Sequence, residues 1–116
     1  MWGEVELEPE VRDWFLALGE ADAARVRFHV DRLADLGPVL DEPYTRQLDG
    51  KLRELRFFLS ARPTRITYCL APGRRIILLT VFVKTQRQER REIRRAKQAM
   101  ERCVAERHTA SDEEED

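Results

Sequence analysis

Positively charged side chains recur at strand-like positions in the middle of this sequence. Arg56 and Arg65 each fall on the polar side of an alternating segment, so we expect neighbouring strands to display them as exposed cations on one sheet face. Phe58 shares the face of Arg56, whereas Tyr68 should point to the opposite face. Further cations stand at the strand ends or at the start of the last helical segment, namely Lys51, Arg53, Lys84, Arg87, Arg90 and Arg91. A cationic groove with a stacking surface is suited to binding single-stranded nucleic acid.

Charge is segregated along the chain, which also favours a polyanionic partner. Residues 1–50 carry 12 acidic and 5 basic side chains, whereas residues 51–107 carry 5 acidic and 16 basic ones, most of them arginine. The last nine residues add five acids, so a net charge of −1 conceals a strongly basic half. Arginine makes forked contacts with phosphate. The alternative is a solvated surface that only keeps the protein soluble, but a net charge of +11 over 57 residues exceeds that need.

Motifs of several enzyme classes are missing from the sequence. It has no Gly-rich phosphate loop, no HExxH motif, no paired CxxC motif and no nucleophile elbow. We interpret His29 and His108 as surface residues rather than catalysts. Cys69 and Cys103 lack metal-ligand spacing, so we interpret them as buried or half-buried residues of a reduced compartment. We therefore expect neither a metal nor a cofactor.

Hydrophobic periodicity predicts the elements that position the cations. Alternation over residues 2–7 predicts a short strand, and helical spacing predicts a hairpin of two helices, one opened by Pro9 and ended by Gly19, the other over residues 21–36. We expect a loop over residues 38–50 and a turn over residues 60–63. Strands are expected over residues 54–59, 65–70 and 76–83, the last apolar on both faces, and a charged helix over about residues 86–107.

This order of elements predicts an α+β fold. An N-terminal strand and a helical hairpin would pack on an antiparallel β-meander, with a C-terminal helix. The length of 116 residues suits one domain, which we place at residues 1–107, followed by a disordered acidic tail at residues 108–116. No apolar run is long enough to span a membrane, and the acidic N-terminus is unlike a signal peptide. We expect a cytoplasmic protein with no membrane partner.

An ordered series of segments resembles the RelE/HigB toxin superfamily, and within it the phage-derived, HigB-like branch. The segments are LDGKLRELRF at residues 48–57, RITY at residues 65–68 and RIILLTVFVK at residues 75–84. RQERREIRRAK at residues 87–97 is similar to the ending of that branch. The resemblance covers about residues 1–105 and implies a RelE-like fold.

The resemblance implies the toxin of a type II toxin–antitoxin system, a ribosome-dependent mRNA endoribonuclease that inhibits translation. The 2′-hydroxyl of the message would attack the adjacent phosphate without a metal, leaving a 2′,3′-cyclic phosphate and a 5′-hydroxyl. The implied catalytic residues are Arg56, Arg65, Lys84 and Arg87. Arg56 and Arg65 would stabilise the phosphorane, and Lys84 would act as acid or as a second clamp that Arg87 reinforces. The RNA-binding residues would be Lys51, Arg53, Phe58, Arg90 and Arg91.

The resemblance also implies partners: the ribosome, mRNA and a cognate antitoxin, usually with a helix-turn-helix domain, through which alone the toxin would meet DNA. The sequence departs from the many members that carry a Tyr or His at the start of the C-terminal segment, where it has Ile93 and arginines. Arginine is a poor base, so Glu54 or Glu89 would be the base, or catalysis would rest on positioning and charge. Glu54 is equally interpreted as a structural partner of Arg56 or Arg65.

Two other functions remain as alternatives. The first is a non-catalytic, degenerate toxin-fold module that binds an antitoxin and acts in operon autoregulation. The second is an interaction protein whose Arg-rich helix binds an acidic partner. Neither alternative protein would cleave RNA, so an RNA-cleavage assay distinguishes both of them from the toxin.

Overall fold

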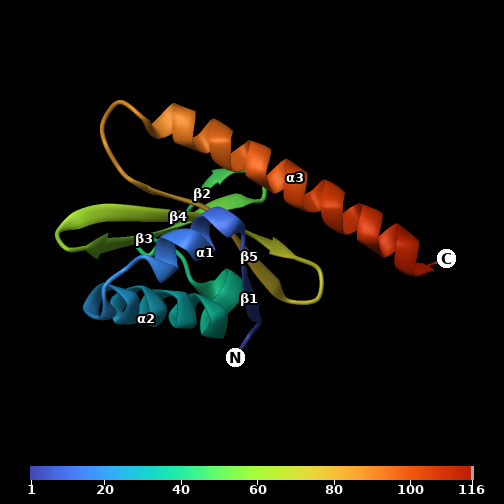
Figure 1. The fold of residues 1–116 in the computed structure, drawn as a ribbon, viewed down its shortest axis with the longest axis horizontal. Helices are drawn as coiled ribbons and strands as arrows, with labels where there is room; N and C mark the ends of the chain where they lie inside the picture. The colour runs from blue at the N-terminus through green and yellow to red at the C-terminus, as the bar shows by residue number, and fades with distance from the viewer. Residues whose placement is uncertain (116) are drawn as a thin grey trace.

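A mixed five-stranded sheet separates a helical hairpin from one long helix in the computed structural model (Figure 1). The structure describes residues 1–115, with side chains described up to Glu106. The elements in chain order are β1 (Glu4–Leu7), α1 (Pro9–Leu16), α2 (Glu20–Leu36), a 3₁₀ turn (Gly37–Val39), β2 (Thr45–Asp49), β3 (Leu52–Leu59), β4 (Arg62–Ala71), β5 (Arg75–Val83) and α3 (Glu89–Glu115). The strand order is β1-β5-β4-β3-β2, in which β1 runs parallel to β5 and every other pair is antiparallel. The predicted α+β class is confirmed.

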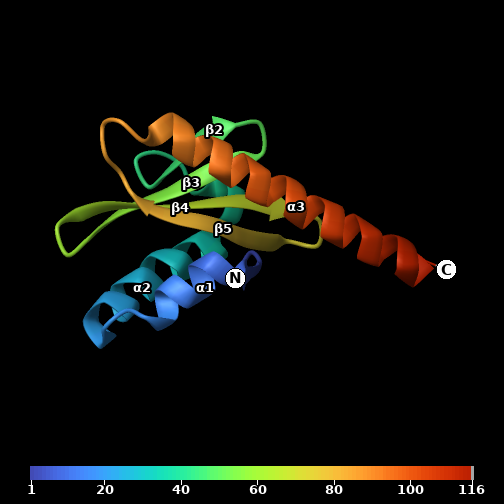
Figure 2. The ribbon, with the colours of Figure 1, turned by 45° about the horizontal axis from the view of Figure 1, so that its top comes forward.

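The hairpin of α1 and α2 covers one face of the sheet, on the side opposite α3 (Figure 2). Proline stands at the first turn of α1, where its missing N–H is not needed. Gly37 ends α2 at a φ of 53°, and a Cβ on it would lie 2.3 Å from the ring of Trp2. Only glycine combines that backbone conformation with so close a ring, so Gly37 fixes where α2 ends.

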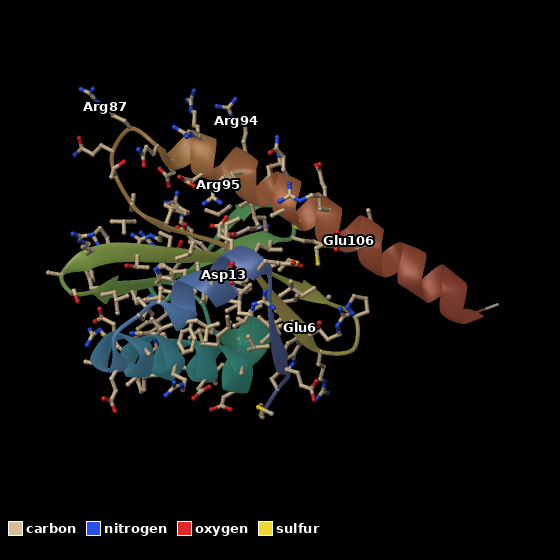
Figure 3. The ribbon with its side chains drawn as sticks, viewed as in Figure 1. Glu6, Asp13, Arg87, Arg94, Arg95 and Glu106 are labelled. Atoms are coloured by element: carbon tan, nitrogen blue, oxygen red, sulfur yellow. The ribbon has the colours of Figure 1, made fainter. Side chains whose placement is uncertain are left out.

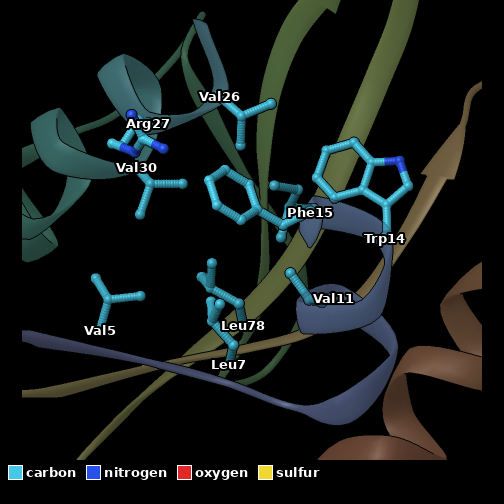
Figure 4. A pocket seen from close by; sticks show the side chains of 10 residues that line it. Val5, Leu7, Val11, Trp14, Phe15, Val26, Arg27, Val30 and Leu78 are labelled. Atoms are coloured by element: carbon cyan, nitrogen blue, oxygen red, sulfur yellow. The ribbon is translucent and has the colours of Figure 1, made fainter. Parts of the chain in front are cut away.

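The main core lies between the helical hairpin and the sheet. Residues from alternating positions of β3 and β4, including Leu55, Phe57 and Ile66, pack there against Val26 and Leu33 of α2. An apolar cavity of about 220 Å³ remains between β1, α1 and α2 (Figure 4). Its lining is Val5, Leu7, Val11, Trp14, Phe15, Val26, Arg27, Val30, Ile66 and Leu78. Arg27 is the one charged residue among the described residues of this lining, and its charged end lies 5.5 Å from the centre of the Phe15 ring. The other residues of the described lining are apolar, so this lining lacks groups that could carry out chemistry.

A second, smaller core lies under α3. Leu52, Ile77 and Leu79 of the sheet meet the small residues of α3, among them Ala96 and Ala99. The strand β5 therefore has apolar residues on both faces, as its sequence predicted. Both cysteines are buried in this core, in agreement with their interpretation as packing residues.

A polar clip fastens α3 to the free edge of β5. Val81 lies beyond the part of β5 that pairs with β1, and its backbone N–H donates to Glu10 Oε2 of α1 over 2.9 Å. Arg95 of α3 donates to the Val81 carbonyl over 3.2 Å and pairs with Glu10 and Glu92. Three elements thus meet at one exposed strand edge and cover its backbone groups.

The structure corrects three expected boundaries. The segment at residues 38–50 is not all loop, because it contains the 3₁₀ turn and the edge strand β2. Pro63 belongs to β4, and the turn before it is Ser60–Ala61, both at positive φ. Helix α3 continues beyond residue 107 to Glu115. The side chains of residues 107–115 and all of Asp116 lie outside the described part, so the disordered tail stays a prediction.

No helix within the described residues is both long and apolar enough to cross a membrane.

Candidate nucleic-acid interface

A buried carboxylate with two arginines lies on the sheet face that carries α3, and we call these three residues the charged cluster. Arg56 of β3 pairs directly with Arg65 of β4. Glu54 lies two residues before Arg56 in β3 and therefore on the same face of the sheet. Glu54 Oε1 is 3.7 Å from the Nε atoms of both Arg56 and Arg65. The side chains of Glu54, Arg65 and Arg56 are 3, 8 and 25% exposed. The interpretation of Glu54 as a structural partner of the arginines is therefore confirmed.

The charges of the cluster act on one another. Burial raises the pKa of Glu54 above its ordinary value, Arg65 and Arg56 partly lower it, and the negative charge of Glu89 raises it. Burial also lowers the pKa of Arg65, and the neighbouring charge of Arg56 lowers it further. Two guanidinium groups share one carboxylate, so the cluster keeps a positive charge. Among the described residues, the buried Nε atoms of Arg56 and Arg65 have no hydrogen-bond partner.

The expectation that both arginines are exposed is wrong for Arg65. This residue lies on the central strand β4, between Arg56 of β3 and Phe82 of β5. Its Nη1 atom donates to the carbonyl of Thr64 over 3.1 Å. Arg56 is therefore the more accessible member of the pair, and Arg65 also contributes to the interior of the sheet face.

The predicted cations around α3 lie close to the same end of the sheet. Lys84 directly follows β5, and its backbone N–H donates to the Pro63 carbonyl over 2.8 Å. Because Phe82 pairs with Arg65, alternation places Lys84 on the sheet face of the cluster. Arg87 points away from the body of the protein, in the turn before α3 (Figure 3). The exposed residues Arg90 and Arg91 follow in the first turn of α3.

Two predicted RNA-binding residues lie elsewhere. Lys51 stands at the opposite end of β3, where it lines a hollow with Met100 and Val104 of α3. Arg53 alternates onto the opposite face and donates to Tyr68 Oη over 3.3 Å and to Thr45 Oγ1 over 3.0 Å. The structure therefore does not bring Lys51 or Arg53 together with the charged cluster.

Arg56 and Arg65 line part of a hollow of about 430 Å³ at the edge of β3, which we call the edge hollow. Its lining comes from α2, the segment before β2, β3 and β4, and consists of Arg25, His29, Pro43, Tyr44, Arg56, Phe57, Phe58 and Arg65. Phe58 is exposed on the face of Arg56, and Tyr68 is buried in the opposite core, as predicted. Sequence reasoning missed Arg25, Tyr44 and His29 as site residues.

His29 is half-buried rather than a surface residue. Its ring stacks on Phe57, with centroids 4.8 Å apart and planes 11° apart. Its Nδ1 atom accepts a hydrogen bond from Arg32 Nη2 over 3.3 Å. Burial lowers the pKa of His29, and the positive charges of Arg32 and Arg25 lower it further. The imidazole is therefore held neutral at the wall of the edge hollow. The i, i+4 spacing of Arg25 and His29 on one helix was the signal available in the sequence.

Comparison with known proteins gives a family and a fold. The model of a family described as phage-derived, Gp49-like proteins matches residues 13–101. No curated protein matches the sequence. The RelE–RelB complex of the archaeon Pyrococcus horikoshii OT3 contains a chain with 21% identity and a TM-score of 0.57, and the match covers 74% of this chain and 99% of that one.

The fold is also similar to that of a second solved toxin. This is a double arginine-to-alanine variant of E. coli RelE in the free state, with 13% identity and a TM-score of 0.58. The match covers 88% of this chain and 98% of that one. The resemblance to the RelE-like toxin superfamily and the expected RelE-like fold are confirmed.

Proposed function

Since the chain belongs to the phage-derived Gp49-like family and has the RelE-like fold, we propose that it is the toxin of a type II toxin–antitoxin system that cleaves mRNA on the ribosome. Such a protein would act in the cytoplasm and inhibit translation. The observation that carries the proposal is the charged cluster, where two arginines share one buried carboxylate and keep a positive charge facing an open hollow.

The cluster suits stabilisation of a phosphorane. When the 2′-oxygen attacks phosphorus, negative charge accumulates on the non-bridging oxygens before the bond to the 5′-oxygen breaks. Arg56 and Arg65 are held by Glu54 and by the strand pairing, so they need little reorganisation as that charge develops. In this mechanism Arg56 contacts the phosphate directly, and Arg65 supports it from the interior.

Proton transfer falls to groups at the start of α3 and the end of β5. Glu54 is buried against two arginines, so it serves as a structural anion rather than as the base. Glu89 is half-buried in the first turn of α3, and its charge acts on both Glu54 and Arg65. We assign Glu89 the proton of the 2′-hydroxyl and Lys84 the proton that the leaving 5′-oxygen receives. Arg87 would reinforce Lys84.

A cognate antitoxin is part of the proposal. One similar structure is that of a RelE–RelB complex, and the basic surface of this chain would attract an acidic partner. The second candidate function is a degenerate toxin-fold module that only binds its antitoxin and helps to regulate the operon. The absence of the family's Tyr or His near Ile93 favours that candidate.

The test is to express the full chain in a bacterium, with and without the gene beside its own, which would encode the cognate antitoxin, and to map 5′-hydroxyl mRNA ends. We expect cuts in translated messages, growth arrest, and rescue by the neighbour. Arg56→Ala should slow cleavage about 10²–10³-fold, because one stabilising donor is lost. Arg12→Ala is the matched control, since Arg12 is an exposed arginine of α1 that pairs with its chain neighbour Asp13 and not with the charged cluster.

Intact messages at confirmed expression would reject the nuclease and favour the binding module. Equal cleavage by wild type and Arg56→Ala would instead keep the nuclease and reject the charged cluster as its centre.

A further inference from the structure

Two exposed aromatic rings share the edge hollow with the arginine pair. Tyr44 is 44% exposed and Phe58 is 60% exposed, and both line the hollow. They come from segments on either side of β2, Tyr44 from directly before it and Phe58 from near the end of β3. Aromatic rings open to solvent beside clustered cations are unusual for a surface whose only task is solubility.

This edge of the sheet is open because β2 pairs with only part of β3. Strand β2 pairs with β3 only from Leu52 to Leu55, so the rest of β3 has no strand neighbour on that side. Two hydrogen bonds cover part of this edge: the N–H of Arg56 donates to the Tyr44 carbonyl, and Arg25 Nε donates to the Phe58 carbonyl, each over 2.8 Å. These bonds fix the backbones that carry both rings, and they leave the ring atoms accessible.

The electrostatics of the edge hollow favour a flat, electron-rich group attached to an anion. The guanidinium of Arg32 lies 4.0 Å from the centre of the Tyr44 ring and steadies it from one side. Arg25, Arg56 and Arg65 line the same hollow, and Glu54 is the carboxylate that pairs with the last two. The volume of about 430 Å³ lies within the range of small-ligand sites, roughly 300–1,000 Å³.

We propose that the edge hollow is a nucleobase subsite, in which Tyr44 and Phe58 stack on one unpaired base of the RNA whose phosphate lies at Arg56. This rests on the proposed function and extends it from cleavage to the choice of the cleaved nucleotide. Stacking on aromatic rings is the usual way in which proteins hold unpaired bases. An acidic peptide would use the cations of the hollow but has no need of two exposed rings.

The experiment uses the full chain and ribosomes programmed with messages whose decoding-site codon carries an abasic nucleotide at its first, second or third position. For wild type, one abasic position should reduce cleavage about 5- to 150-fold, the range expected for loss of one base–aromatic stack. Tyr44→Ala and Phe58→Ala should cleave the normal message correspondingly more slowly and should no longer respond to that abasic position. Tyr44→Phe should behave as wild type, because it keeps the ring.

Leu16→Ala is the control, since Leu16 is an exposed apolar residue of α1 that does not line the edge hollow. Thermal unfolding of each variant separates loss of the fold from loss of the subsite, and Tyr44→Phe and Phe58→Tyr provide well-folded alternatives. Wild-type sensitivity at one position that both alanine variants abolish supports the subsite.

Three results would overturn it. If the alanine variants respond to abasic positions as wild type does, the subsite is rejected while the nuclease stands. If they lose only affinity for the antitoxin, the hollow is a peptide site instead. If wild type cleaves no programmed ribosome at all, the proposed function fails and the subsite fails with it.

Discussion

The sheet face under α3 has two ends that differ in kind. At one end, Leu52, Ile77 and Leu79 pack against small residues of α3 and form a closed apolar core. At the other end, the same face carries Glu54 and the arginine pair beside the open edge of β3. One helix closes the first end, and only its charged first turn approaches the second.

The difference shows how a small domain accommodates a charged site. The apolar end and the helical hairpin supply burial, so the charged end need not be optimal for stability. The charged end lowers stability in one visible way: the buried Nε atoms of Arg56 and Arg65 have no hydrogen-bond partner among the described residues. Substitutions at the apolar end should therefore change stability alone, whereas substitutions at the charged end should change both stability and activity.

The largest effect should follow removal of the shared carboxylate. Glu54→Ala leaves Arg65 buried beside Arg56 without a counter-charge, so we expect the free energy of unfolding to fall by about 3–5 kcal/mol. Urea denaturation measures this change. Glu54→Gln keeps the shape and one acceptor, and it should lose less. A change below about 1 kcal/mol for Glu54→Ala would mean that water screens the charged cluster in solution.

The apolar end provides the contrasting substitution. Leu79→Ala should lower the free energy of unfolding by about 2–5 kcal/mol, because it leaves a cavity beneath α3. Activity per folded molecule should stay at the wild-type value. Val104→Ala, an exposed position of α3, is the control and should change stability by less than about 0.5 kcal/mol. Loss of activity in folded Leu79→Ala would show that the two ends are coupled.

The sequence predicted the α+β class and placed Arg56 and Arg65 on one sheet face, and it failed where long-range contacts decide. Alternation predicted the facing of Arg56, Phe58 and Tyr68 because strand periodicity is local. It missed β2, a short edge strand whose Thr45 is buried and donates to the Leu40 carbonyl over 2.8 Å, because its sequence is mostly polar. The segment therefore has the composition of a loop.

The edge hollow could not be predicted for a different reason. Its walls come from α2, the segment before β2 and two strands, and only tertiary packing brings Tyr44 beside Phe58. The burial of Arg65 likewise depends on its strand becoming central in the sheet, with β3 and β5 on either side. A polar position in an alternating segment predicts a face, and it does not predict how deeply that face is covered.

A smaller effect should follow neutralisation of the first turn of α3. Arg90→Gln combined with Arg91→Gln should weaken binding to programmed ribosomes at low salt. It should also make the salt dependence shallower, by about 0.7 in the log–log slope for each lost single-strand phosphate contact. Titrations at several salt concentrations test this, with Arg12→Gln as the control. An unchanged slope would mean that these arginines do not contact phosphate.

The smallest expected effect is a pH dependence that arises at the wall of the edge hollow. Burial and the charges of Arg32 and Arg25 lower the pKa of His29 in the folded chain, whereas in the unfolded chain it should stay near 6.5. The unfolded chain then binds the proton more readily as pH falls, so the stability that neutral His29 contributes is complete above pH about 6.5 and is lost as pH drops through the folded pKa. Between pH 7 and pH 5, wild type should therefore lose more stability than His29→Gln, as measured by urea denaturation at each pH. His108 and the carboxylates are present in both proteins, so the difference between the two slopes isolates His29. Parallel slopes would mean that His29 is as accessible to protons in the folded chain as in the unfolded one, and that the hollow is open to water on the side of α2.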